Sequence, residues 1–288
     1  MSLFRHVETF TSSSSSSPSL PHTTPQLRLE KSTMADNHPL NSDTNPSMQT
    51  LITLKPYFAG QPKALSGIAL RAFCLGLTLA SSLIFTLAIL FFTDSPLWRA
   101  PWFLGALSLF HFLEFWTTAH KNTLVAGIDS FLLTANWPSY AIAHTSAFVE
   151  TVIVGYFFPN RVLAPAWIVV PFGLGLVLIG QIVRSLAMLH AGASFNHHIQ
   201  QSKATTHTLV TTGIYSVFRH PSYFGFFWWG LGTQIVLGNL VCFVAYTAVL
   251  WYFFYERIRG EEKKLVEFFG RDYVTYRERV GTKIPFIK

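Results

Sequence analysis

Residues 220–255 of this 288-residue chain read HPSYFGFFWWGLGTQIVLGNLVCFVAYTAVLWYFFY, a run of 36 residues without Asp, Glu, Lys or Arg. A single helix of that length would measure about 54 Å, far more than a bilayer core of about 30 Å. Gly238 and Asn239 lie in the middle of the run and are typical of a turn. The stretch therefore predicts a tight hairpin of two membrane spans, Pro221–Leu237 and Leu240–Tyr255.

Four further apolar stretches precede the hairpin, and each is about as long as a membrane span. They are Ala72–Phe92, Pro101–His120, Pro138–Phe158 and Val162–Val183. About 20 apolar residues are needed to cross a hydrocarbon core. We therefore predict an all-α fold, a polytopic helical membrane protein with about six transmembrane helices, or eight if the longer stretches are broken.

The charged residues are distributed as in a membrane protein. Only 12% of the chain is charged, compared with about 25% in soluble domains. Residues 66–255 carry 11 charges, whereas the last 33 residues carry 15. Lys and Arg lie before the first span, in the loop 191–220 and in the tail, which fall on one side in a six-span arrangement. The positive-inside rule makes that side cytosolic, so the net charge of +7 indicates membrane orientation rather than binding to nucleic acid.

The first 50 residues differ from the rest in composition. They include the serine run Ser12–Ser17 and five prolines, and they contain no apolar run. We expect a disordered Ser/Pro-rich extension over 1–50, without a cleaved signal, followed by N-terminal transmembrane helices over 51–190 and a cofactor-binding and catalytic region over 191–288. A transit peptide is an alternative, because Ser and Thr are abundant, although Glu8 and Glu30 oppose its few arginines.

Three glycines in the fourth stretch, Gly173, Gly175 and Gly180, do not have the spacing of a dinucleotide-binding loop. They lie in a predicted membrane span, where small residues allow helices to approach closely. We therefore expect them at helix–helix contacts.

Polar side chains gather in the loop 191–220, which is expected to contribute to a cytosolic pocket. Asn196, His197, His198, Gln200 and His207 precede the sequence Arg219-His220-Pro221. The loop holds neither an H-E-x-x-H motif nor an acidic residue, so we predict no metal site. Ordinary surface polarity is the alternative for any single histidine here.

The pair His220-Pro221 predicts where the next helix begins. The residue before proline avoids helical dihedrals, and proline itself is favoured at the first helical position. The helix is therefore expected to start at Pro221, with free backbone N–H groups at Ser222 and Tyr223. Free N–H groups at a helix start can bind an anion or a carboxylate.

A second cluster of charges follows the hairpin in the sequence ERIRGEE, residues 256–262. Arg257 and Glu261 are four residues apart and therefore lie on one face of a helix. Two interpretations stay open from the spacing alone. The helix could simply be charge-paired at the membrane surface, or the two side chains could bind a zwitterionic ligand, or a cofactor beside an acidic substrate.

Several stretches together resemble the isoprenylcysteine carboxyl methyltransferases. They are GASFNH (192–197), Gln200, THTLVTTGIYSVFRHPSYFGFFWWGLGTQ (206–234), the pair Glu261-Glu262, FFGRDYVTYRERVGTKIPFI (268–287), and more weakly HFLEFWTTA (111–119) and DSFLLTANWPSYAIAHTSAFVE (129–150). Members of that family are endoplasmic reticulum membrane enzymes. They use S-adenosylmethionine to methylate the C-terminal carboxylate of farnesylated or geranylgeranylated cysteine after CaaX proteolysis.

The resemblance also implies roles for individual residues. Cofactor contacts are implied for Gln200, His207, Thr208, Leu209, Val210, Tyr215, His220, Pro221, Ser222, Tyr223 and Glu261. Arg257 is implied to face the substrate as the catalytic and substrate-binding residue. The chain departs from the family at Gly260, where another acid is frequent, and at the pair His197-His198.

Elementary chemistry agrees with this resemblance. A C-terminal carboxylate, with a pKa near 3.5, is ionised at pH 7 and needs no general base. Arg257 could orient both of its oxygens. Two alternatives remain: a phospholipid N-methyltransferase, which would need a base, and a non-catalytic lipid-binding protein in which Glu114, Glu150 and Arg184 line a pathway.

Overall fold

The computed structural model describes residues 52–134, 137–159, 165–197 and 208–288. The extension predicted to be disordered, residues 1–50, lies outside the described residues. Residues Leu54–Lys288 form one compact unit. All regular secondary structure in the described ranges is helical, which confirms the predicted all-α class.

Six long helices occupy the six stretches that the sequence predicts to be spans. They are α2 (Leu65–Phe92), α3 (Arg99–Lys121), α4 (Ser139–Phe157), α5 (Ala166–Ala191), α6 (Pro221–Leu237) and α7 (Val241–Phe269). The short helix α8 (Arg271–Arg279) follows, and 3₁₀ turns include η1 (Lys55–Tyr57), η2 (Pro96–Trp98), η3 (Ile128–Phe131), η4 (Gly192–Ser194) and η5 (Gly213–Ser216). By length and composition, three of the described helices can cross a membrane: α2, the helix that begins at Ala166, and α7. The number of spans therefore stays a prediction.

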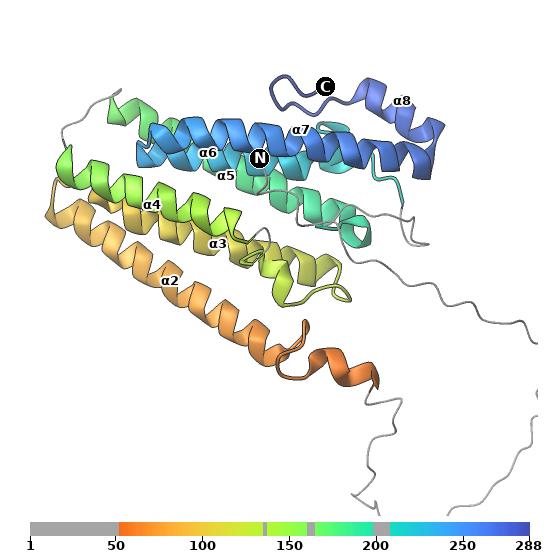
Figure 1. Ribbon diagram of the computed structural model, residues 1–288, viewed down its shortest axis with the longest axis horizontal. Coiled ribbons are helices and arrows are strands. Elements are labelled where there is room, and N and C mark those ends of the chain that lie inside the picture. Colours follow the sequence, from red (N-terminus) through yellow and green to blue (C-terminus); the bar gives the residue numbers. More distant parts are fainter. Residues whose placement is uncertain (1–51, 135–136, 160–164, 198–207) are drawn as a thin grey trace, which may run out of the picture. The chain divides into compact units, whose positions relative to one another are not determined.

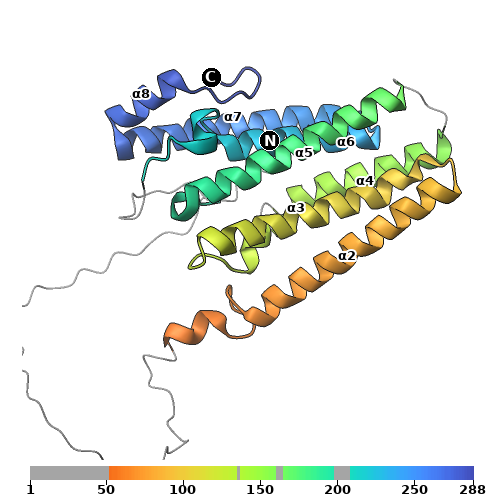
Figure 2. The same cartoon turned by 180° about the vertical axis from the view of Figure 1, so that it is seen from behind.

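Helix α6 packs against both α5 and α7, as Figures 1 and 2 show from two sides. The α5–α6 contact depends on glycines. A Cβ atom on Gly180 would lie 2.6 Å from the Gly225 carbonyl oxygen, and one on Gly173 would lie 2.8 Å from Val236. The expected packing role is confirmed for these two glycines. It is wrong for Gly175, which faces open space and meets no atom within 4 Å.

The predicted pair of helices with a turn at Gly238-Asn239 is confirmed, whereas the membrane crossing of α6 stays a prediction. Helix α4 holds the turn. Gly238 has a φ of +73°, in the left-handed region that favours glycine. The side-chain nitrogen of the buried Asn239 donates to the Ala147 carbonyl oxygen at 2.9 Å. The Glu150 carboxylate accepts the backbone N–H groups of residues 240, 241 and 242 at 2.8, 2.9 and 2.7 Å. A carboxylate at a helix start satisfies donors that the helix leaves free and complements its dipole.

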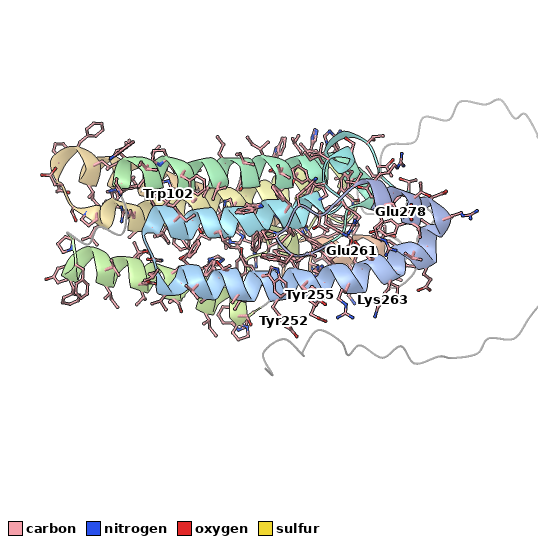
Figure 3. The ribbon with its side chains drawn as sticks, turned by 90° about the horizontal axis from the view of Figure 1, so that it is seen from above. Trp102, Tyr252, Tyr255, Glu261, Lys263 and Glu278 are labelled. Carbon is pink, nitrogen blue, oxygen red and sulfur yellow. The ribbon has the colours of Figure 1, made fainter. Side chains whose placement is uncertain are left out.

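The predicted span Leu240–Tyr255 is part of the longer helix α7, which continues through Gly260 to Phe269 and confirms that Arg257 and Glu261 lie on one helix. Its outer part carries the ion pairs Glu256–Arg259 and Lys264–Glu267 at the i,i+3 spacing, which supports a helix in water. In Figure 3, Glu261 lies on the inner side of α7 and Lys263 projects from its outer side.

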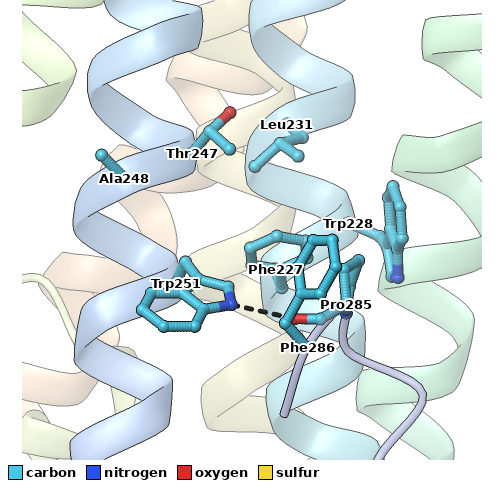
Figure 4. A pocket seen from close by; sticks show the side chains of 8 residues that line it. All are labelled: Phe227, Trp228, Leu231, Thr247, Ala248, Trp251, Pro285 and Phe286. Carbon is cyan, nitrogen blue, oxygen red and sulfur yellow. Dashed lines mark hydrogen bonds between the residues drawn. The ribbon is translucent and has the colours of Figure 1, made fainter.

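The chain beyond α8 runs back along the hairpin. Ile284 and Ile287 are buried in a cluster with residues of α6 and α7, including Phe227. The indole nitrogen of Trp251 donates to the Pro285 carbonyl oxygen at 2.8 Å. An apolar groove of about 310 Å³ lies here between α6, α7 and the last residues (Figure 4).

Candidate active site

Tyr223 joins the two charged side chains that the sequence places on one face of α7. Its hydroxyl donates to Glu261 Oε2 at 2.6 Å and accepts from Arg257 Nε at 3.0 Å. The guanidinium of Arg257 also lies 5.7 Å from the centre of the Tyr223 ring. The first turn of α6 therefore fixes a cation and a carboxylate beside each other.

His220, directly before α6, lies on the same side of the site. Its ring stacks on Tyr223, with centroids 5.5 Å apart and an interplanar angle of 6°. Its Nδ1 lies 3.8 Å from Glu261 Oε2, and its Nε2 lies 3.2 Å from Glu262 Oε1. The histidine thus faces both acids of the Glu261-Glu262 pair.

The predicted start of α6 at Pro221 is confirmed, with His220 as the preceding N-cap residue. The predicted free N–H at Tyr223 is wrong. His220 has a ψ of 67°, and its carbonyl oxygen accepts the Tyr223 N–H at 3.1 Å. One of the two donors expected to bind an anion is therefore already used within the first turn, while the free N–H of Ser222 stays a prediction.

A buried ion pair that the site predictions did not include lies behind this turn. Arg184 on α5 bonds Glu114 on α3, with 2.8 Å between Nη2 and Oε2, and only 6% and 1% of these residues are exposed. Arg184 Nη1 also donates to the carbonyl and hydroxyl oxygens of Ser222 at 3.2 and 3.0 Å. The sequence offered one signal for this pair: Glu114 lies within one apolar stretch, and Arg184 directly follows another.

These contacts bear on the three residues that would line a pathway in a lipid-binding protein. Glu114 and Arg184 are used by each other and by α6, and Glu150 caps α7. In the described structure all three have structural partners.

The loop residues contribute around the edge of the site. Arg257 donates through Nη2 to the His197 carbonyl oxygen. The Tyr215 hydroxyl donates to the Ala187 carbonyl oxygen at 3.3 Å, and burial, with the Glu261 carboxylate as a further cause, raises the pKa of Tyr215. Its hydroxyl is therefore neutral at physiological pH.

The other predicted loop residues are less informative. The backbone N–H of the exposed Thr208 donates to Ser194 Oγ at 3.3 Å, and Leu209 and Val210 are half-buried. Gln200 and His207 lie outside the described residues. Of the predicted residues, the structure thus brings together Arg257, Glu261, Tyr223 and His220 most closely.

This geometry can hold a ligand of mixed charge. Glu261 and His220 face it with acceptor atoms for hydroxyl or ammonium donors, while Arg257 has a guanidinium for a carboxylate. The aromatic faces of Tyr223 and Phe253, both about 6 Å from the Arg257 guanidinium, favour cationic groups nearby. The apolar groove of Figure 4 is lined by none of these residues.

Comparison with known proteins gives consistent matches. A model of the isoprenylcysteine carboxyl methyltransferase family matches residues 173–267. The protein-S-isoprenylcysteine O-methyltransferase of Xenopus laevis is 43% identical over 221 residues, covering 77% of this chain and 74% of the relative. The Saccharomyces cerevisiae protein of the same name is 46% identical over 189 residues, covering 64% of this chain and 79% of the relative.

A solved structure agrees. The eukaryotic intramembrane Ras methyltransferase, an isoprenylcysteine carboxyl methyltransferase, superposes with a TM-score of 0.72 at 40% identity. The match covers 83% of this chain and 82% of the other. These matches, together with the helical fold of the described residues, define a membrane-embedded methyltransferase. The chain belongs to the isoprenylcysteine carboxyl methyltransferase family.

Proposed function

We propose that this protein moves a methyl group from S-adenosylmethionine to the C-terminal carboxylate of an isoprenylated cysteine. The observation that carries the proposal is the bridging hydroxyl of Tyr223, which sets Arg257 and Glu261 side by side. The Arg257 guanidinium, which would bind the substrate, therefore lies next to the Glu261 carboxylate, which would bind the cofactor.

Arg257 is proposed to bind both oxygens of the substrate carboxylate. Its guanidinium is a planar fork that matches a carboxylate, whereas lysine has a point charge. The bound carboxylate is ionised at pH 7, so no proton has to be removed before it attacks. The main requirement is alignment, which contacts from Tyr223 and His197 to Arg257 provide.

S-Adenosylmethionine fits the side of the site that Glu261 and His220 form, and when bound it supplies an electrophilic methyl group. Glu261 would accept hydrogen bonds from its ribose or ammonium. The residues Gln200, His207, Thr208, Leu209, Val210, Tyr215, Pro221, Ser222 and Tyr223 are proposed to complete this side. The rings of Tyr215 and Tyr223 would favour its sulfonium over a neutral product.

The substrates are proposed to be CaaX-processed proteins with farnesyl or geranylgeranyl cysteine, and the location is proposed to be the endoplasmic reticulum membrane. The positive-inside rule supports a cytosolic site. In a six-span arrangement, the loop that contains Lys203 and Arg219 and the basic tail fall on the same side of the membrane as the site. The isoprenyl chain would then reach the site from the bilayer.

A methyl-transfer assay with a small farnesylated cysteine tests the function. Purified protein in detergent should transfer radiolabelled methyl groups to that acceptor as a base-labile ester. Phosphatidylethanolamine serves as the competing acceptor. Transfer to its amine without transfer to the cysteine would identify a phospholipid N-methyltransferase instead. Binding of the cofactor without transfer to either acceptor would contradict both activities.

A further inference from the structure

The two adjacent acids of α7 contact different groups. Successive residues of a helix project about 100° apart, at 3.6 residues per turn. Glu261 accepts from Tyr223, at the centre of the site. Glu262 instead accepts from Arg219 Nε at 2.7 Å and from His220 Nε2 at 3.2 Å, and its side chain is the more buried of the two. Among the described residues, Glu262 therefore binds the protein rather than the open side of the site.

Arg219 connects Glu262 to the end of α8. Its Nη1 donates to the carbonyl oxygens of Arg277 and Val280 at 3.1 and 2.8 Å. Its backbone N–H donates to the Gly281 carbonyl oxygen at 3.0 Å. The last carbonyls of a helix have no partners within it, and a cation is favoured at that end. Arg219 thus caps α8 and, through the same side chain, holds α7.

A second bond joins α8 to the loop before α6. The Tyr276 hydroxyl donates to the Tyr215 carbonyl oxygen at 2.6 Å. Burial raises the pKa of Tyr276 to about 12, so the donor proton is kept at any physiological pH. The segment from Tyr215 to Arg219 is therefore attached to α8 and its C-terminal end at both of its own ends.

The contact with Glu262 also determines which atom His220 offers to a ligand. A carboxylate only accepts hydrogen bonds, so Nε2 carries the hydrogen in the bond to Glu262. In the neutral ring, Nδ1 is then an acceptor, 3.8 Å from the acceptor Glu261 Oε2. Two acceptors at this spacing suit a ligand with paired donors, such as a ribose diol or an ammonium group.

We propose that Glu262 and Arg219 are positioning residues that make α8 part of the cofactor site. They fix His220 beside Glu261, and Tyr276 fixes the loop that leads to it. This inference rests on the proposed function, since it concerns the binding of S-adenosylmethionine. The substrate side depends on Arg257, which bonds Tyr223 and the His197 carbonyl oxygen. Tyr223 also stacks on His220 and donates to Glu261, so the network reaches Arg257 through one intermediate residue, and we expect a smaller effect there.

Two variants of the full-length protein test the proposal. Glu262→Gln keeps the shape and an acceptor oxygen but removes the charge, and Tyr276→Phe removes one hydrogen bond while its ring stays. Calorimetric titration with S-adenosylmethionine should give a dissociation constant about tenfold higher for Glu262→Gln and about threefold to tenfold higher for Tyr276→Phe. KM for farnesylated cysteine should change less than about threefold in both variants.

Two controls match these variants in chemistry. Glu267→Gln alters an exposed acid of the same helix that pairs only with Lys264 among the described residues. Tyr252→Phe alters a tyrosine of α7 that is 52% exposed. Both controls should bind the cofactor like the original protein.

Cofactor affinity unchanged in both test variants would overturn the inference, and so would an equal loss on the cofactor and substrate sides. If Glu262→Gln fails to fold, Tyr276→Phe alone decides between these outcomes. Failure of the proposed function would give a different result, in which the unaltered protein binds S-adenosylmethionine but methylates no prenylated cysteine. The dissociation constants of the variants could still be compared in that case.

Discussion

Tyr223 shows how one residue can define a site whose parts come from distant positions. Its hydroxyl contacts Arg257 and Glu261, which lie 34 and 38 positions further along the chain. The sequence indicates that Arg257 and Glu261 share a helix face, because they are four residues apart. Local spacing carries no information about which side chain of α6 lies between them, so this contact could not be predicted.

The role of Arg257 separates two interpretations that the sequence leaves open. We predict that Arg257→Lys is nearly as damaging to turnover as Arg257→Ala. Lysine loses the planar fork, and a misalignment of about 1 Å can reduce the rate a hundredfold. Cofactor affinity should survive both substitutions. Turnover is measured in detergent. Near-normal turnover in the lysine variant would show that Arg257 only places a positive charge at the membrane surface and does not orient the substrate.

Glu261 is predicted to act on the cofactor side. Glu261→Ala should raise the dissociation constant of S-adenosylmethionine roughly tenfold to hundredfold, because a hydrogen bond to a charged group contributes about 1.5–3 kcal/mol. Calorimetric titration measures this directly. An affinity equal to that of the original protein would remove Glu261 from the site.

At the scale of elements, the α6–α7 hairpin was the most predictable part. A charge-free run too long for one span, with Gly238-Asn239 in the middle, leaves few other structures. A helix over Arg257 and Glu261 was predicted, but its continuity with the span and its end at Phe269 were not, because the run of apolar residues ends at Tyr255 and charged residues do not mark a helix by hydropathy. The capping of α7 by Glu150 was also missed, since it joins α4 to a turn 90 residues later.

The α5–α6 contact leads to a matched prediction. Gly180→Ala should lower the thermal unfolding midpoint in detergent, since its Cβ would lie 2.6 Å from a backbone oxygen of α6. Overpacking of this kind typically costs about 1–3 kcal/mol. Gly175→Ala should leave the midpoint unchanged or raise it, because that glycine meets open space and alanine is the better helix former. Equal effects at both positions would contradict the assigned contact.

At the scale of the whole molecule, the sequence indicated the fold class and the stretches that supply the candidate site, but not the long-range pairs that hold these stretches together. Glu114 and Arg184 come from different apolar stretches, and Arg219 reaches α8 across 58 positions. Such pairs follow from tertiary packing, which local patterns do not encode. The roles of Gln200 and His207 remain predictions.

The N-terminal extension leads to a prediction for the whole chain. A protein that starts near Leu51 should insert and keep its specific methyl-transfer activity, because residues 1–50 are polar and lie outside every motif of the site. The assay compares both forms at equal amounts of membrane-extracted, monodisperse protein. Reduced specific activity in the shortened form would assign the extension a function.

The burial of Ile287, which follows α8 in the chain, has a consequence for biosynthesis. This side chain packs on the hairpin, and the nearby Gly281 carbonyl oxygen receives the Arg219 N–H. Because synthesis runs from the N-terminus, α6 and α7 leave the ribosome before Gly281 and Ile287 do. The hairpin can therefore enter the membrane before these contacts form, and the segment after α8 closes over helices that are already in place.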